Sequence, residues 1–102
     1  RVPTPNVSVV DLTFESSKST TESEINSYIE NASLSDLKGI LGFTKEKLVS
    51  MDFNHDPHSS IFAADQTKVL QNNMVRVLSW YDNEWGFSNR MSDTALEMAK
   101  FL

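Results

Sequence analysis

The sequence predicts an α+β fold in which a mostly antiparallel sheet is combined with two main helices, one of them long and C-terminal. Several short segments alternate apolar and polar residues, which is the pattern of half-buried strands. Two longer segments repeat their apolar residues every three or four positions, as amphipathic helices do. The connections at 54–59 and 71–73 are too short to contain a crossover, so the strands they join should be antiparallel.

The N-terminal third is expected to form a strand and then a helix. The run 9–15 alternates, and Val10, Leu12 and Phe14 give this strand one strongly apolar face. Thr21 and Glu24 have the spacing of a capping box, which marks the start of a helix. A helix of about three turns should follow, with a buried stripe formed by Ile25, Tyr28, Ile29 and Ala32.

The remainder is expected to contain more strands and the long helix. The expected strands and apolar segments lie at 40–43, 48–53, 60–64 and 75–81. The strand 75–81 carries apolar residues on both faces, so it should be central and covered on both sides. Asp82 and Asn83 end this strand and can cap a helix over 84–102. The stripe of that helix comprises Phe87, Met91, Ala95, Met98 and Leu102.

Composition excludes several classes of protein. A chain of 102 residues makes one domain with a modest core. Its net charge is −5 and its nine Lys and Arg residues never cluster, so no nucleic-acid partner is expected. No apolar run approaches the roughly 18 residues of a membrane helix, so no membrane is expected either. The absence of cysteine excludes disulfides and thiolate metal sites, and it fits a cytoplasmic protein.

Two segments carry a resemblance to a known family. The chain opens on RVPTPNVSVVDL and later reads WYDNEWGFSNRM. Both resemble the phosphorylating aldehyde dehydrogenases of the glyceraldehyde-3-phosphate dehydrogenase family, most densely at 1–13, 37–43, 48–60 and 78–90. That family's chemistry runs through a cysteine thiolate, yet the chain has neither a cysteine nor a GxGxxG dinucleotide motif. Residues 1–102 are therefore expected to be the C-terminal part of the catalytic domain, without the dinucleotide-binding domain.

The resemblance implies roles for three residues. Arg1 would help form a site for inorganic phosphate or a substrate phosphate, because a guanidinium matches phosphate oxygens bidentately; by itself it reads as a frayed terminus. Asn83 would bind the carboxamide of nicotinamide, since an amide both donates and accepts hydrogen bonds; by position alone it reads as a helix cap. Phe87 stands where many relatives carry tyrosine. Its ring is expected near the nicotinamide or, equally, as a packed aromatic in the first helical turn.

The histidines of the HDPH motif are not expected to bind a metal. Pro57 opposes the helical geometry that would put His55 and His58 on one side, and a motif this short often matches by chance. No catalytic residue is predicted within the chain, because the resemblance implies a nucleophilic cysteine and a histidine base in segments before Arg1. The loop should lie at the surface or at a subunit contact.

The resemblance implies an NAD-dependent oxidation of an aldehyde through a cysteine thioester, which phosphate opens to an acyl phosphate. The parent enzyme would be a glycolytic homotetramer that takes a sugar phosphate and inorganic phosphate. The chain alone is expected to be inactive and to bind no cofactor. Glyceraldehyde 3-phosphate is the expected substrate. The segments FNHDPHS and WGFSNRM resemble erythrose-4-phosphate dehydrogenase as well, and a non-catalytic oligomerising domain is a third interpretation.

Overall fold

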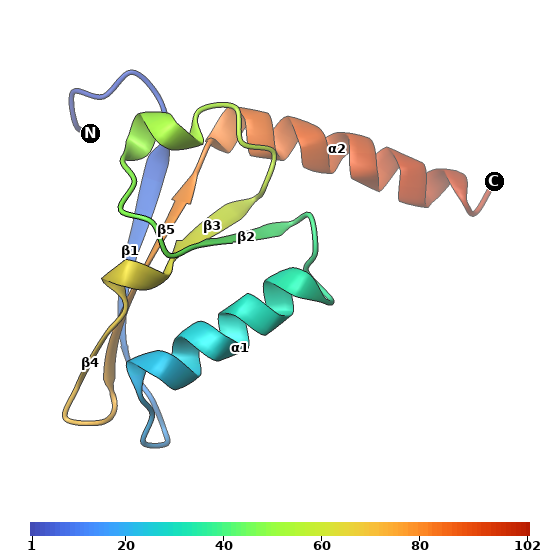
Figure 1. Ribbon diagram of the computed structural model, residues 1–102. Helices are drawn as coiled ribbons and strands as arrows, with labels where there is room; N and C mark the ends of the chain where they lie inside the picture. The colour runs from blue at the N-terminus through green and yellow to red at the C-terminus, as the bar shows by residue number, and fades with distance from the viewer.

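A computed structural model describes all 102 residues and confirms the α+β class (Figure 1). Its five strands form one sheet in the order β1–β5–β3–β2, and β4 also pairs with β5. The strands are β1 (Ser8–Glu15), β2 (Leu41–Thr44), β3 (Ser60–Ala63), β4 (Lys68–Leu70) and β5 (Met74–Tyr81). The helices are α1 (Glu22–Leu34) and α2 (Asn83–Ala99), with short 3₁₀ turns η1 (Ser50–Phe53) and η2 (Ala64–Gln66).

β5 is the central strand, as its apolar residues on both faces predict. It pairs with β1 over its whole length, and Ser8 lies opposite Tyr81. Its other side pairs with β3 near the end of the strand and with β4 near the start. Val75 and Leu78 point to opposite faces of the sheet and both are buried, so β5 is covered twice. The register makes the segment before β1 and the segment after β5 neighbours.

The structure corrects the prediction of a strand at 48–53. Residues 50–53 form η1, in which the Asp52 carboxylate accepts a hydrogen bond from the Val49 backbone N–H at 2.7 Å. A side-chain acceptor of this kind competes with strand pairing. The turn brings Phe53 onto Trp80, with 5.7 Å between the stacked ring centroids. The predicted antiparallel pair across 54–59 is therefore wrong, and β3 pairs in parallel with β2 instead.

The other predicted antiparallel pair is confirmed. β4 and β5 flank the turn at 71–73 and pair antiparallel, with Val69 opposite Val75. Gln71 and Asn72 have φ angles of 50° and 64°, in the left-handed region that such tight connections use. The short segment between them therefore fixes the register of this hairpin.

α1 begins at the predicted capping box. Thr21 Oγ1 accepts from the Glu24 backbone N–H at 3.2 Å, and the Glu24 carboxylate accepts from the Thr21 N–H at 2.9 Å. Asn26 connects the helix to η2 and to the residue that follows it, because it donates to the Ala64 carbonyl and accepts from the buried Thr67 hydroxyl. The predicted stripe is only partly covered: Ile25, Ile29 and Ala32 are half-buried, whereas Tyr28 is 72% exposed.

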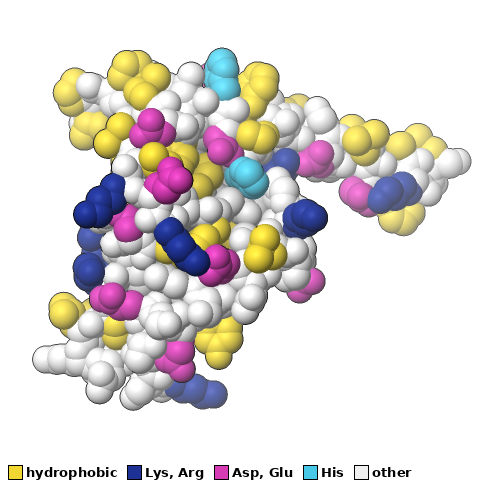
Figure 2. Space-filling model, in the orientation of Figure 1, with side chains coloured by type: hydrophobic (Ala, Val, Ile, Leu, Met, Phe, Trp, Pro, Cys, Tyr) yellow, Lys and Arg dark blue, Asp and Glu magenta, His cyan; other side chains and the backbone are white.

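α2 extends away from the sheet (Figure 1). It begins one residue earlier than predicted and ends at Ala99 rather than Leu102. Gly86 is its only buried residue, and every residue from 91 onward is exposed. Hydrophobic side chains line this projecting arm (Figure 2), where Met91 is 60% and Met98 66% exposed. The apolar stripe of α2 therefore faces solvent in this chain.

The core is small and lies mainly between the sheet and η1. Val7, Phe53 and Ile61 are buried together, with Leu48 and Trp80 packed against them. The predicted apolar face of β1 is largely uncovered, with Val10, Leu12 and Phe14 all more than 40% exposed. Neither helix combines the length and the apolar character that a membrane crossing requires.

Candidate functional site

Arg1 and Asn83 line the same hollow, although they lie at opposite ends of the sequence. The hollow has a volume of about 760 Å³, and its wall is built mainly from the segment before β1 and the end of β5. The antiparallel register of β1 and β5 explains this placement, because it puts the start of one strand beside the end of the other. Both side chains are exposed. Two residues that the resemblance singled out separately are thus brought to one place.

The helix cap is Asp82, so the reading of Asn83 as a cap is wrong. Asp82 Oδ1 accepts from the Trp85 backbone N–H at 3.1 Å, and Asn83 is already the first residue of α2. Asp82 thereby satisfies one of the free donors at the helix start. The Asn83 amide makes no hydrogen bond within the chain, so its donor and acceptor groups are both available at the hollow.

Phe87 lies one turn after Asn83, on the same side of α2. Its side chain is 66% exposed, and it does not line the hollow. Phe87 is therefore not a packed aromatic within this chain, contrary to that interpretation. Its expected position near the nicotinamide stays a prediction.

Asp82 connects three parts of the chain, which the sequence did not indicate. Its other carboxylate oxygen, Oδ2, accepts from the Asn6 side-chain amide and from the His55 backbone N–H, each at 2.9 Å. Asn6 also donates to Asn54 Oδ1 at 2.7 Å. Asp82 is only 2% exposed. It thus joins the segment that carries Arg1, the loop 54–59 and the start of α2.

The hydrogen bonds keep Asp82 ionised. Burial alone would raise the pKa of Asp82, because it disfavours the charged form. The backbone N–H groups of His55 and Trp85 and the amide of Asn6 outweigh this effect, and the pKa lies below the ordinary value of 3.8. At neutral pH Asp82 is an acceptor only, so its role is to hold donors in place.

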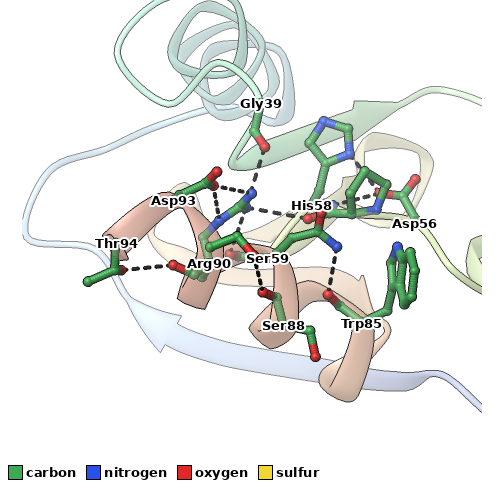
Figure 3. A network of polar contacts seen from close by, with 12 residues as sticks. Gly39, Asp56, His58, Ser59, Trp85, Ser88, Arg90, Asp93 and Thr94 are labelled. Carbon is green, nitrogen blue, oxygen red and sulfur yellow. Dashed lines mark hydrogen bonds and ion pairs between the residues drawn. The ribbon is translucent and has the colours of Figure 1, made fainter. Parts of the chain in front are cut away.

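The loop 54–59 packs against the first turns of α2 (Figure 3). His55 has a φ of 62°, and its ring stacks on Trp85 with 4.9 Å between the ring centroids. His58 contacts Asp56 instead, with 2.6 Å between Nδ1 and the carboxylate. The two histidines of the HDPH motif therefore have different partners and different surroundings.

Gly86 and Arg90 complete this contact between loop and helix. A Cβ atom at Gly86 would lie 2.8 Å from the carbonyl oxygen of His58, so only glycine allows the loop to approach this closely. Arg90 Nη1 reaches the Pro57 carbonyl at 3.4 Å and Ser59 Oγ at 3.3 Å, while its Nε donates to Asp93 (Figure 3). The start of α2 is thus fixed to the loop through two successive turns.

Val7 has an unusual backbone conformation beside the hollow. Its φ is 72°, in a region that β-branched residues rarely occupy. Its side chain is 6% exposed and packs with Phe53 and Ile61. Such strain persists only where the surrounding core enforces it. The core therefore dictates how the segment 1–6 turns into β1 along the hollow.

Comparison with known proteins identifies the family of this chain. A family model described as glyceraldehyde 3-phosphate dehydrogenase, C-terminal domain, matches residues 1–83. The chain therefore corresponds to part of the C-terminal domain of a dehydrogenase family. It belongs to the glyceraldehyde-3-phosphate dehydrogenase family, as its opening and closing motifs predict. The matched range includes Arg1 and Asn83 and ends before Phe87.

Relatives match along the whole chain. A glyceraldehyde-3-phosphate dehydrogenase of Cereibacter sphaeroides is 67% identical over 102 residues, which is all of this chain and 31% of the relative. The protein of the same name from Xanthobacter flavus is 64% identical over 98% of the chain and 30% of the relative. That of Zymomonas mobilis is 56% identical over 100% of the chain and 31% of the relative. The chain thus spans less than a third of the length of these relatives.

Proposed function

We propose that this chain is the C-terminal portion of the catalytic domain of an NAD-dependent, phosphorylating glyceraldehyde-3-phosphate dehydrogenase. In this proposal the dinucleotide-binding domain lies in another part of the same protein. The observation that carries the proposal is the single hollow lined by both Arg1 and Asn83. The family match and the names of the relatives support the same assignment.

The residues of the hollow fit the chemical groups they would hold. Asn83 can both donate to and accept from the carboxamide of nicotinamide, because Asp82 has taken over the capping of α2. Arg1 can offer its guanidinium to a phosphate, which suits a planar fork of donors. Phe87, one turn beyond Asn83, can add an apolar ring beside the cofactor. The tyrosine hydroxyl of many relatives is absent at this position.

The chain's own contribution is binding and orientation. NAD, when bound, supplies the hydride acceptor for oxidation of the aldehyde. The chain contains no cysteine, so the nucleophile must come from outside these 102 residues. Holding the carboxamide and a phosphate in fixed positions lowers the barrier through orientation. We therefore expect the isolated chain to bind no cofactor measurably and to be inactive.

The full-length protein that contains this chain provides the test. With NAD and inorganic phosphate, it should form NADH from glyceraldehyde 3-phosphate with a kcat/KM about tenfold or more above that for erythrose 4-phosphate. The reverse order would establish the erythrose-4-phosphate dehydrogenase alternative, which the segments FNHDPHS and WGFSNRM favour. If neither aldehyde is turned over, the interpretation as a non-catalytic oligomerising domain is the one that remains. The isolated chain serves as the blank.

The proposal extends to the setting of the enzyme. We place it in glycolysis in the cytoplasm, as a homotetramer with a sugar phosphate and inorganic phosphate as substrates. The uncovered apolar residues of β1 and α2 support an assembly, because apolar surfaces of this extent usually contact a partner. In this proposal the sheet surface contributes to tetramer contacts and α2 packs partly on the dinucleotide-binding domain.

A further inference from the structure

The junction between β5 and α2 is held by groups that are distant in sequence. Asp82 accepts from Asn6 on one side and from His55 on the other, each at 2.9 Å. These donors lie on the wall of the hollow and on the loop 54–59, respectively. Asn83 follows Asp82 directly. A rotation of the Asp82 backbone would therefore turn the Asn83 side chain away from the hollow.

The loop gives the junction a second fixed contact. Trp85 stacks on His55, and the backbone of Gly86 lies against the carbonyl of His58. These contacts hold the first turn of α2 against the loop 54–59. The Asp82 carboxylate adds a connection that the loop contacts lack, because it accepts from Asn6 as well as from the backbone N–H groups of His55 and Trp85.

We propose that Asp82 is a positioning residue that directs Asn83 into the hollow, by fastening the start of α2 to Asn6 and to the loop 54–59. The inference rests on the proposed function, in which Asn83 binds the nicotinamide carboxamide. Asp82 itself touches no reactant in this scheme. Its contribution is to fix in advance the rotamer and backbone direction that the cofactor requires.

Asp82→Asn is the variant that isolates this role. Asparagine has nearly the same shape and can still accept from the Trp85 N–H, so α2 keeps its cap. Its NH₂ group then replaces Oδ2 and faces two donors, the Asn6 amide and the His55 N–H. The variant therefore releases the cross-connections and retains the helix start.

A double-mutant cycle in the full-length protein tests the proposal. The Kd for NAD is measured by calorimetry for wild type, Asp82→Asn, Asn83→Ala and the double variant. Each single change should raise the Kd by about three- to tenfold. The double variant should match Asn83→Ala within about twofold, because Asp82 acts through Asn83. Effects that multiply, or an unchanged Kd in Asp82→Asn, would overturn the inference.

Two controls separate positioning from general destabilisation. Thr67→Val removes a comparable buried hydrogen bond, that between Thr67 Oγ1 and Asn26 at 2.7 Å, and neither residue lines the hollow or bonds to Asp82. It should lower Tm and leave the Kd for NAD unchanged; a rise equal to that of Asp82→Asn would refute the proposal. If Asp82→Asn does not fold, Asn6→Ala takes its place in the cycle. Asn6→Ala should raise the Kd for NAD by a smaller factor, and it should cause no further rise when Asn83→Ala is already present.

The cycle also distinguishes a failure of the proposed function from a failure of the positioning role. If Asn83→Ala leaves the Kd for NAD unchanged, the assigned role of Asn83 is wrong and the inference falls with it. If Asn83→Ala weakens NAD binding and Asp82→Asn does not, the proposed function stands and only the positioning role fails.

Discussion

Arg1 illustrates how little a single side chain establishes until its neighbours are known. It is exposed and has no partner within the chain, as any terminal arginine can be. Its position on the wall that it shares with Asn83 is what connects it to the proposed binding site. An unpaired guanidinium beside an open hollow is suited to an anion, because no internal carboxylate competes for it.

Replacement of Arg1 by alanine in the full-length protein should raise the KM for inorganic phosphate by about tenfold or more, since a charged hydrogen bond contributes about 1.5–3 kcal/mol. Arg1→Lys should recover only part of the loss, because lysine keeps the charge and lacks the planar fork. The Kd for NAD should be unaffected in both variants. An unchanged KM for phosphate in Arg1→Ala would show that Arg1 does not bind phosphate.

Asp82 should make the stability of the chain depend on pH in the acidic range. Its pKa is lowered in the folded state, so its contribution is fully present above the ordinary value of 3.8 and is lost as pH falls through the lowered pKa. Thermal unfolding between about pH 6 and 2 should therefore show a steeper fall of Tm for wild type than for Asp82→Asn. Asp11, whose pKa the Arg76 hydrogen bond also lowers, is present in both proteins and cancels in the comparison. Parallel curves would contradict this prediction.

Among the contacts between elements, that of α2 with the loop 54–59 depends on Gly86, which has no Cβ atom. Helix propensity alone favours Gly86→Ala by up to about 1 kcal/mol. The added Cβ would meet the His58 carbonyl oxygen at 2.8 Å, and backbone on both sides must then move. Overpacking of this kind costs about 1–3 kcal/mol, so the steric term should win.

Gly86→Ala is therefore expected to lower the free energy of unfolding in a urea titration of the chain. Ser92→Ala serves as the matched control, because Ser92 is exposed on the free part of α2 and its hydroxyl makes only a 3.4 Å hydrogen bond to the Ser88 carbonyl of the same helix. The control should be neutral or slightly stabilised. A stabilised Gly86→Ala would mean that the loop and the helix separate easily.

Local patterns predict most of the elements, because they follow from periodicity and capping along a continuous segment. The alternation of 9–15 and the Thr21–Glu24 box both lead to the observed β1 and α1. The segment 48–53 fails for a physical reason. Its apolar residues have a strand-like distribution, yet the Asp52 carboxylate closes a turn on the Val49 N–H. A side-chain hydrogen bond three residues away overrides a weak strand preference.

At the scale of the whole molecule, the candidate site arises from the pairing of distant strands. The motifs indicated Arg1 and Asn83 one by one, but only the β1–β5 register places them around one hollow. The hydrogen bonds of Asp82 Oδ2 were not predictable, because its partners Asn6 and His55 lie 76 and 27 positions away. From sequence alone, an aspartate at the start of a helix is interpreted as a cap. The sequence does not indicate that its second carboxylate oxygen accepts hydrogen bonds from distant segments.

The extent of uncovered apolar surface leads to a prediction about assembly. Phe87, Met91 and Met98 are each at least 60% exposed on α2, and Leu12 and Phe14 are exposed on β1. Surfaces of this kind on small soluble domains usually find a partner. We expect the isolated chain to associate at a concentration of about tens of micromolar, most simply as a two-fold dimer, which is the commonest symmetry.

Light scattering over a dilution series measures this association directly. Met91→Glu should weaken it, because a buried unpaired carboxylate at the contact would be costly. Met91→Leu is the matched control, since it keeps the apolar stripe and should associate like the wild type. Association that persists in Met91→Glu would move the contact to the open face of β1. A monomeric mass for the unmodified chain at every concentration would show that solvent exposure of α2 is tolerated, and the prediction would be wrong.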